Sequence, residues 1–147
     1  MAIAETALVV DASVFVEYLA PGPAHSEVAP LFAAELSVEL WTPDLCLLEV
    51  ANALRKRFLT DKRFTRRHLA DGVTDLVALG PLVVSSRALV GAAIEFAENL
   101  TVYDAVYLVL ASARGIPICT LDTGMAAQAR KAGIAVQEPG AGRLLAY

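Results

Sequence analysis

The stretch from Leu100 to Gly115 constrains the fold most, because it combines an almost wholly apolar helix pattern with one carboxylate. Its apolar residues recur at helical spacing and cover most of a helix's circumference. The sequence therefore predicts a helix buried nearly all round, with Thr101 as its N-cap and Gly115 ending it. Asp104 lies near the start of this helix. A carboxylate on a buried helix must be capped, paired or bound to a cation.

Short apolar runs alternate with helical patterns along the rest of the chain. We predict strands at about 7–10, 40–42, 82–84, 116–121 and 134–136. We predict further helices at about 12–19, 26–36, 45–59, 65–79, 85–98 and 124–131, and a surface tail over 139–147. This alternation is typical of an α/β fold, with a mainly parallel sheet of about five short strands flanked by helices. A chain of 147 residues favours a single domain.

Composition excludes several classes of protein. No apolar run approaches the roughly 20 residues of a membrane span, and the first residues lack the basic region and cleavage site of a signal peptide. Cys46 and Cys119 each lie among apolar neighbours, which favours small core residues over a disulfide. We therefore expect a cytoplasmic protein.

Acidic residues recur where the predicted strands end. Asp11 and Asp122 each follow a strand and precede a helix, so both fall at the carboxyl edge of the sheet, where α/β proteins place their sites. Glu49 is surrounded on its helix by apolar residues, and Asn52 shares its face three residues later. Helix capping is an alternative for Asp11, Asp104 and Asp122. A buried hydrogen-bonded pair or an exposed stripe is the alternative for Glu49 and Asn52.

Four carboxylates gathered at one sheet edge predict a metal site. Anions in a dry cleft raise one another's pKa values, and a divalent cation relieves that repulsion. Oxygen ligands suit Mg²⁺ or Mn²⁺, while the His and Cys spacing of zinc sites is absent. His25 and His68 are expected to be ordinary surface residues. Carboxylate-held metals act chiefly on phosphate esters, where they activate water and neutralise charge on the phosphoryl oxygens.

The basic residues are concentrated in one segment, although the net charge of the chain is −4. The segment 55–67 holds seven of the twelve Lys and Arg residues, opposed only by Asp61: Arg55, Lys56, Arg57, Lys62, Arg63, Arg66 and Arg67. A solvated helix–turn–helix tip is one interpretation. The other is a basic patch beside the acidic site that holds a polyanionic substrate.

Four motifs give the chain a family resemblance over roughly residues 8–136. They are VVDASV at 9–14, the E-x-x-N of Glu49 and Asn52, TVYDAVYLVLA at 101–111 and TLD at 120–122. In their order and spacing they resemble PIN-domain proteins, and within that group the VapC-type toxins of toxin–antitoxin pairs. The resemblance implies a PIN-like three-layer fold, with residues 1–147 forming one PIN domain.

The resemblance also implies an activity and a set of site residues. It implies a Mg²⁺-dependent endoribonuclease, with Mn²⁺ as a possible substitute, acting as the toxin of such a pair. The implied acidic cluster is Asp11, Glu49, Asp104 and Asp122. In it, Asp11 and Asp104 would be metal ligands, Glu49 would orient the attacking water, and Asp122 would complete the cluster. The supporting hydrogen bonds would come from Ser13, Asn52 and Thr120, while Tyr103 would pack or position its helix.

The partners implied by the resemblance are an RNA substrate, a second copy of the chain and a cognate VapB-type antitoxin. The antitoxin would wrap the protein and cover its site, and a groove between the early helices and the basic helix pair would suit it. Two alternatives remain open. One is a PIN-domain nuclease in RNA processing without an antitoxin, and the other is a non-catalytic protein-binding module whose acids are only helix caps.

Overall fold

A five-stranded parallel sheet organises the computed structural model, which describes residues 6–33 and 37–139. The strands are β1 (Ala7–Val10), β2 (Glu39–Pro43), β3 (Leu82–Val84), β4 (Ile118–Cys119) and β5 (Val136–Gln137). Their order is β3-β2-β1-β4-β5, and every pair is parallel. The predicted α/β class with a parallel sheet is confirmed. The central strand, β1, is followed by Asp11, and its neighbour β4 is followed by Thr120-Leu121-Asp122.

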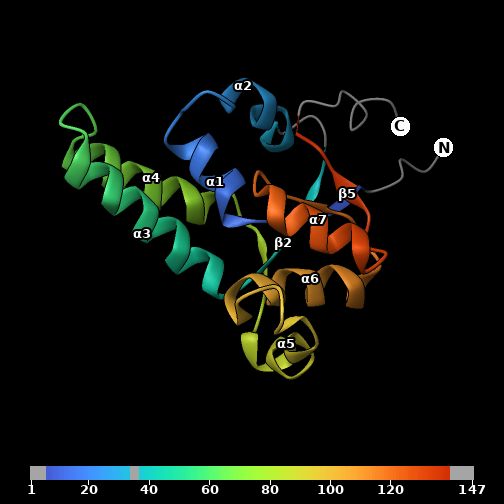
Figure 1. Cartoon of the computed structure of the whole chain (residues 1–147). Coiled ribbons are helices and arrows are strands. Elements are labelled where there is room, and N and C mark those ends of the chain that lie inside the picture. The colour runs from blue at the N-terminus through green and yellow to red at the C-terminus, as the bar shows by residue number, and fades with distance from the viewer. Residues whose placement is uncertain (1–5, 34–36, 140–147) are drawn as a thin grey trace.

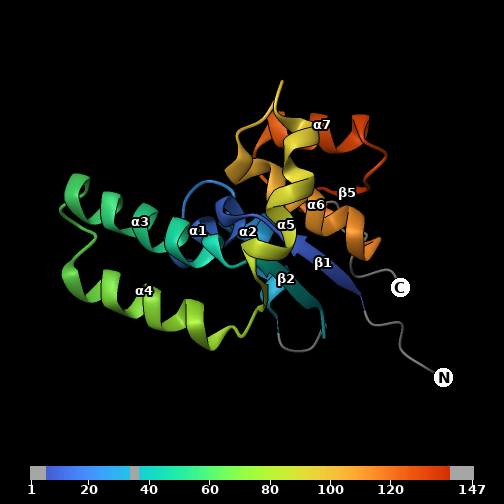
Figure 2. The same ribbon diagram turned by 90° about the horizontal axis from the view of Figure 1, so that it is seen from below.

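Helices flank this sheet, and two of them project away from it. The helices are α1 (Ala12–Leu19), α2 (His25–Val28), α3 (Leu45–Thr60), α4 (Arg66–Ala78), α5 (Ser86–Ala93), α6 (Val102–Arg114) and α7 (Thr123–Lys131). Helix α6 packs on β1, β2 and β4, and α5 packs on α6. Figures 1 and 2 show α3 and α4 leaving the sheet side by side as an antiparallel pair. We call this pair, residues 45–78, the helical arm.

Two predicted helices are wrong in extent. The helix expected over 26–36 is replaced by the short α2 and a 3₁₀ turn over Ala29–Phe32, because Pro30 lacks an N–H and its ring clashes with a continuing α-helix. Residues 34–36 lie outside the described residues. The helix expected over 85–98 ends at Ala93, and a 3₁₀ turn over Ile94–Phe96 follows it. This tighter turn lets the chain reverse before α6 begins.

The fourth and fifth strands are also shorter than predicted. Only Ile118 and Cys119 of the segment 116–121 pair in the sheet, because Pro117 has no N–H to donate and Thr120 turns toward the sheet edge. The last strand covers Val136–Gln137 rather than 134–136. Of the predicted surface tail, only Pro139 lies within the described residues.

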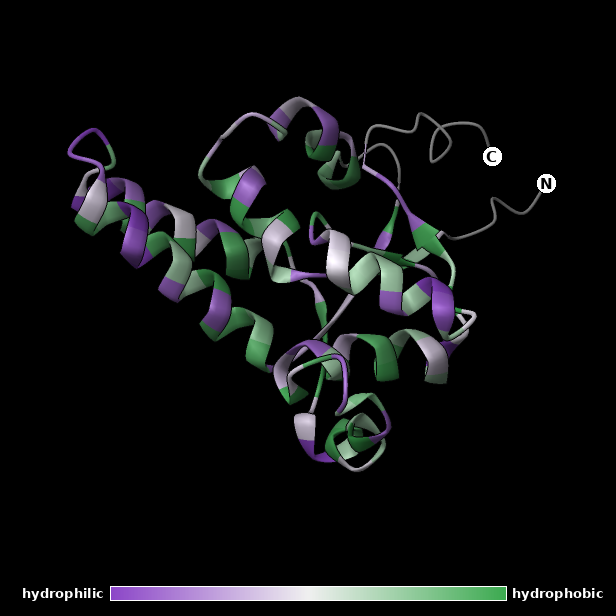
Figure 3. Ribbon diagram, in the orientation of Figure 1, coloured by the Kyte–Doolittle hydropathy of each residue, from purple (hydrophilic) through white to green (hydrophobic). Residues whose placement is uncertain are grey.

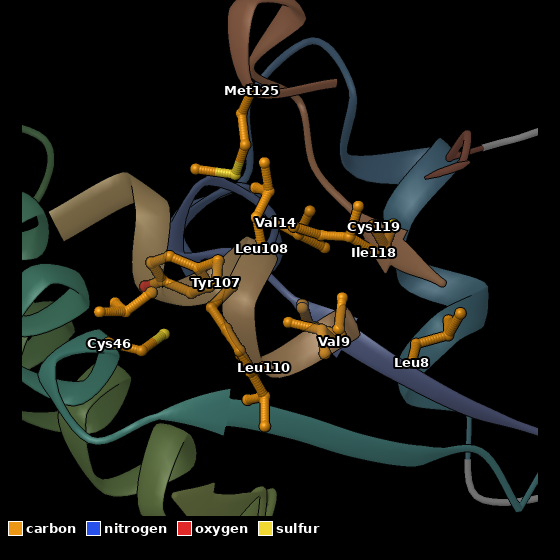
Figure 4. Close-up of a cluster of buried hydrophobic side chains, with 14 of the residues drawn as sticks. Leu8, Val9, Val14, Cys46, Tyr107, Leu108, Leu110, Ile118, Cys119 and Met125 are labelled. Atoms are coloured by element: carbon orange, nitrogen blue, oxygen red, sulfur yellow. The ribbon is translucent and has the colours of Figure 1, made fainter. Parts of the chain in front are cut away.

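The core is centred on α6. Its residues from Ala105 to Ala111 are all buried, which confirms the predicted buried helix, although its first and last turns are exposed. Figure 4 shows Tyr107, Leu108 and Leu110 among side chains from β1 and β4. Burial of the middle of this helix fixes the position of Asp104 in its first turn.

Both cysteines lie in this core as free thiols, as predicted. Burial raises the pKa of Cys46 to about 11 and that of Cys119 to about 12, so both stay protonated at neutral pH. Among the helices in residues 6–33 and 37–139, none has the length and apolar character needed to cross a membrane.

The helical arm is held together by a close approach of its two helices. Gly72 of α4 is buried against Leu54 of α3, and a Cβ at this glycine would lie 3.0 Å from Leu54 Cδ1. Near the tip, Arg57 pairs with Asp61 at 3.2 Å, and the Arg66 guanidinium lies 5.4 Å from the centroid of the Phe58 ring. Figure 3 shows hydrophilic residues concentrated along the arm and at its tip.

Candidate functional site

The parallel sheet brings the predicted acidic residues to its carboxyl edge. Asp11 directly follows β1, and Asp122 follows β4 after two residues. Glu49 lies in the second turn of α3, the helix that follows β2, and Asp104 lies in the first turn of α6. The segments that follow three strands and the N-terminus of one helix therefore meet at the carboxyl edge of the sheet, where α/β proteins place their sites.

Asp11 is the most deeply placed of the four acids, with 6% of its surface exposed. Its Oδ2 atom accepts hydrogen bonds from Ser13 Oγ at 2.7 Å and from Thr120 Oγ1 at 2.8 Å. Burial raises the pKa of Asp11, and these two hydroxyls oppose the shift only in part. Asp11 occupies the N-cap position of α1 but makes no side-chain capping bond, so capping does not account for it.

Two hydroxyl groups tie the ends of β1 and β4 together around Asp11. Ser13 Oγ accepts from the Leu121 N–H at 3.1 Å while it donates to Asp11. Thr120 Oγ1 accepts from the Asp122 N–H at 2.9 Å while it donates to Asp11. Ser13 and Thr120 thus lie against the acidic cluster through hydrogen bonds, which is the placement the sequence predicted for them.

Glu49 is half-buried and is paired with a residue that sequence reasoning missed. The Tyr107 hydroxyl of α6 donates to Glu49 Oε1 at 2.6 Å, and Tyr107 is fully buried. A tyrosine within an aliphatic helix is the signal that could have revealed this, because a buried Tyr O–H needs a partner. Asn52 is exposed instead of sharing an interior face with Glu49. Asn52 lies about one helical turn after Glu49 on α3, where its side chain is exposed to solvent.

Asp104 and Asp122 both take part in helix N-termini. Thr101 Oγ1 accepts from the Asp104 N–H at 3.2 Å, which confirms Thr101 as the N-cap of α6. Asp122 Oδ1 accepts from the Met125 N–H at 3.0 Å, so Asp122 caps α7. Asp104 is half-buried and Asp122 is exposed. Capping by one oxygen of Asp122 leaves its second oxygen for another role.

Mutual repulsion links the four carboxylates. Burial is the main reason that the pKa of Glu49 is raised, and the charges of Asp11 and Asp104 raise it further. Burial also raises the pKa of Asp104, with a further contribution from the charge of Asp122. The charge of Asp104 acts in the same direction on Asp11. The four acids therefore form one electrostatic unit, which gains stability when a cation or proton is bound.

The donor chemistry of this acidic cluster fits a hard divalent cation. All four acids offer carboxylate oxygens, the ligands that Mg²⁺ and Mn²⁺ prefer, and they repel one another without a positive partner. As positioned, no three His, Cys, Asp or Glu side chains in the described part of the chain are close enough to hold one metal ion. Coordination of one ion by three of these acids would require their carboxylates to move closer together.

The basic segment runs outward along the helical arm from the acidic cluster. Its first residue, Arg55, lies six residues after Glu49 on α3, about 9 Å along the helix axis, and its other basic residues follow toward the tip of the arm. Most of its seven basic side chains are exposed, while Arg57 is half-buried against Asp61. That the patch adjoins the acidic cluster stays a prediction.

Three further predicted residues lie away from the cluster or outside the core. His25 is half-buried and stacks on Tyr18, with ring centroids 5.7 Å apart, and exposed His68 takes part in the N-terminal cap of α4. Tyr103 is 68% exposed, so it does not pack its helix against the core.

A cavity of about 520 Å³ opens between the end of α1 and the helical arm. Its lining includes Leu19 and Pro21 on one side and Arg57, Phe64 and His68 on the other. It matches the groove expected between the early helices and the basic helix pair.

The chain matches one known protein family and has the fold of several solved structures. The sequence model of the family described as the PIN domain matches residues 8–131. No curated protein sequence matches the chain. Among solved structures, VapC20 of Mycobacterium tuberculosis, described as a toxin that cleaves the sarcin–ricin loop, is 18% identical with a TM-score of 0.68, covering 90% of this chain and 99% of its own.

Two further structures have the same fold. PAE2754 of Pyrobaculum aerophilum is 22% identical with a TM-score of 0.61, covering 99% of this chain and 90% of its own. FitAcB of Neisseria gonorrhoeae is 21% identical with a TM-score of 0.58, covering 88% of this chain and 95% of its own.

Proposed function

Because the chain belongs to the PIN-domain family, we propose that it is a Mg²⁺-dependent endoribonuclease, with Mn²⁺ as a possible substitute. The observation that carries this proposal is the set of four carboxylates at one sheet edge, three of which have pKa values raised by burial and by one another's charge. Such a set favours binding of a divalent cation, and carboxylate-held cations act chiefly on phosphate esters.

Each residue of the acidic cluster has a distinct role in this proposal. Asp11 and Asp104 hold the cation, and Asp122 completes the cluster. A bound Mg²⁺ would lower the pKa of a water molecule and neutralise charge on the phosphoryl oxygens. Glu49 orients the attacking water, and its raised pKa brings the carboxylate closer to the range in which it can accept a proton near neutral pH.

Neighbouring side chains hold these acids in place. Ser13 and Thr120 fix one carboxylate oxygen of Asp11, and Tyr107 fixes one of Glu49. Asn52 lies one turn beyond Glu49 on the solvent side of α3, from which it can contact the substrate or its water. The seven basic residues of the helical arm contact parts of a long RNA remote from the cut bond.

We propose further that this nuclease is the toxin of a toxin–antitoxin pair, acts in the cytoplasm and forms a homodimer. The similar fold of VapC20, described as a toxin that cleaves the sarcin–ricin loop, supports the toxin role. The cavity between α1 and the helical arm supports binding of a VapB-type antitoxin, because its polar and aromatic lining can take side chains of a partner segment.

Cleavage of single-stranded RNA tests the nuclease proposal. We expect the purified protein to cut RNA with Mg²⁺ and to lose this activity in EDTA. Asp104→Asn should lower kcat by at least about 100-fold, since it removes a charged ligand. Glu95→Gln removes one exposed acidic charge outside the cluster and serves as the matched control. Cleavage by Asp104→Asn at the parental rate would contradict the role of Asp104.

The genetic context separates the toxin from the other two candidates. A toxin should arrest growth when expressed, and co-expression of a short neighbouring reading frame should relieve the arrest. Cleavage without growth arrest would favour an RNA-processing nuclease. A binding module predicts no Mg²⁺-dependent chemistry at all.

A further inference from the structure

A second cavity, of about 280 Å³, opens directly beside the acidic cluster. Its lining includes Thr120, Asp122 and Thr123 at the end of β4, and Arg130 and Glu138 farther out. Two of these residues, Thr120 and Asp122, are joined to the cluster by the hydrogen bonds described above. The cavity is therefore an extension of the proposed active site along α7.

Arg130 is the basic side chain of this cavity. Residues 122, 126 and 130 are spaced four apart, so Asp122 and Arg130 share one face of α7 and lie about 12 Å apart along its axis. The helical arm holds its basic residues on the opposite flank, beyond α3. A substrate that crosses the acidic cluster toward α7 thus meets a guanidinium that the charge pattern of the sequence did not single out.

The present partner of Arg130 can be displaced. Its Nη2 atom lies 2.9 Å from Glu138 Oε1, and both side chains are more than half exposed, at 54% and 69%. Exposed ion pairs of this kind contribute little to stability. A phosphate group can therefore replace the Glu138 carboxylate without a large structural cost, and guanidinium groups bind phosphate oxygens through paired hydrogen bonds.

We propose that this cavity binds a ribonucleotide flanking the cut bond, with Arg130 contacting its phosphate. In this arrangement Glu138 competes with the phosphate for Arg130. The inference rests on the proposed nuclease function and adds to it the location and polarity of one substrate contact. The alternative is that Arg130 and Glu138 only tie α7 to the segment after β5.

Binding of a short single-stranded RNA that the protein cannot cleave tests this site. The Asp104→Asn variant provides the background, because the RNA then stays intact while Kd is measured at several salt concentrations. Arg130→Ala in that background should weaken binding about 5- to 10-fold, as expected for loss of one charged hydrogen-bonded contact. The slope of log Kd against log salt should fall by about 0.7, the value for one phosphate contact on a single strand.

Lys131→Ala is the matched control. Lys131 is the next residue along the chain, it is exposed, and it does not line the cavity. Its substitution removes the same charge as Arg130→Ala. It should leave Kd and the salt slope near those of the background. Glu138→Gln should tighten RNA binding, because it removes the competing carboxylate. This result does not depend on how well Arg130→Ala folds.

Two results would overturn the inference while leaving the proposed function intact. One is an equal salt slope for Arg130→Ala and Lys131→Ala in a protein whose parent cleaves RNA. The other is weaker RNA binding by Glu138→Gln, which would identify a purely structural pair. A parent that neither binds nor cleaves RNA would instead overturn the proposed function itself.

Discussion

At the scale of single residues, the hydrogen bond from Tyr107 to Glu49 connects the buried core to the acidic cluster. Tyr107 is fully buried in α6, and its hydroxyl reaches across to α3. It lowers the pKa of Glu49 against the stronger effect of burial. Burial is the main reason that the pKa of Tyr107 is raised, and the bond to Glu49 raises it further, so the tyrosine stays a donor throughout the working pH range. The tyrosine therefore orients Glu49 and favours its ionised form.

Tyr107→Phe should remove this bond with little change in shape. We expect the free energy of unfolding to fall by about 1–2 kcal/mol, as for loss of a hydrogen bond to a charged group that is half-exposed. The pKa of Glu49 should rise further, so the acidic limb of the pH profile of kcat/KM should move to higher pH. Chemical denaturation and the pH profile measure the two effects.

Tyr103→Phe is the control for this substitution. Tyr103 lies one turn earlier on α6 and is 68% exposed, so loss of its hydroxyl should change stability by no more than about 0.5 kcal/mol. An unchanged pH profile for Tyr107→Phe would show that Glu49 does not control the acidic limb.

At the scale of elements, the helical arm depends on the contact between Gly72 and Leu54. Leu54 is fully buried and cannot move aside easily. A Cβ at position 72 would lie 3.0 Å from Leu54 Cδ1, closer than an ordinary contact, so Leu54 or α4 would have to shift. The glycine therefore allows the two helices of the arm to pack closely at this point.

Gly72→Val should lower the free energy of unfolding by about 1–3 kcal/mol through overpacking. Ala70→Val, at an exposed position of the same helix, is the control. Valine has a higher helix propensity than glycine and a lower one than alanine, and each difference is about a few tenths of a kcal/mol. A greater loss at position 72 than at 70 must therefore come from packing, and the reverse order in urea unfolding would contradict the contact.

At the scale of the whole molecule, the acidic cluster makes stability depend on pH and on metal. The folded state raises the pKa values of Asp11, Glu49 and Asp104, so it binds protons more tightly than the unfolded chain does. The contribution of these three groups to stability without metal is therefore fully present below the ordinary carboxyl pKa of about 4. It falls as pH rises through the raised pKa values. Asp44 and Asp61, whose pKa values are lowered, are already ionised there in both states.

Mg²⁺ should reverse this loss near neutral pH. We expect Tm in EDTA to decrease from weakly acidic to neutral pH and to recover with Mg²⁺, by mass action on the folded state. Asp104→Asn should raise Tm in EDTA, because it removes one repelling charge, and should reduce the Mg²⁺ effect. Thermal melts at two pH values measure both changes. A Tm that is independent of Mg²⁺ at neutral pH would count against a shared metal site.

Local sequence pattern was sufficient to predict several parts of this protein. Apolar periodicity decides which faces are buried, so it located α6, the parallel sheet and the core cysteines. Parallel strands end at one edge, so the positions of Asp11 and Asp122 after their strands were enough to place them together. Pro30 is also present in the segment 26–36, and its effect on helices is enough to predict a shorter helix there.

Contacts between side chains of different helices and strands depend on how the chain folds in space. Glu49 and Tyr107 are 58 residues apart, and no local pattern pairs them. The basic residues are clustered in sequence and follow the outward course of α3 along the arm, while α7 brings Arg130 alongside the cavity next to Asp122. The physical reason is that periodicity fixes which face of an element is buried, whereas the path of each crossover fixes what that face contacts.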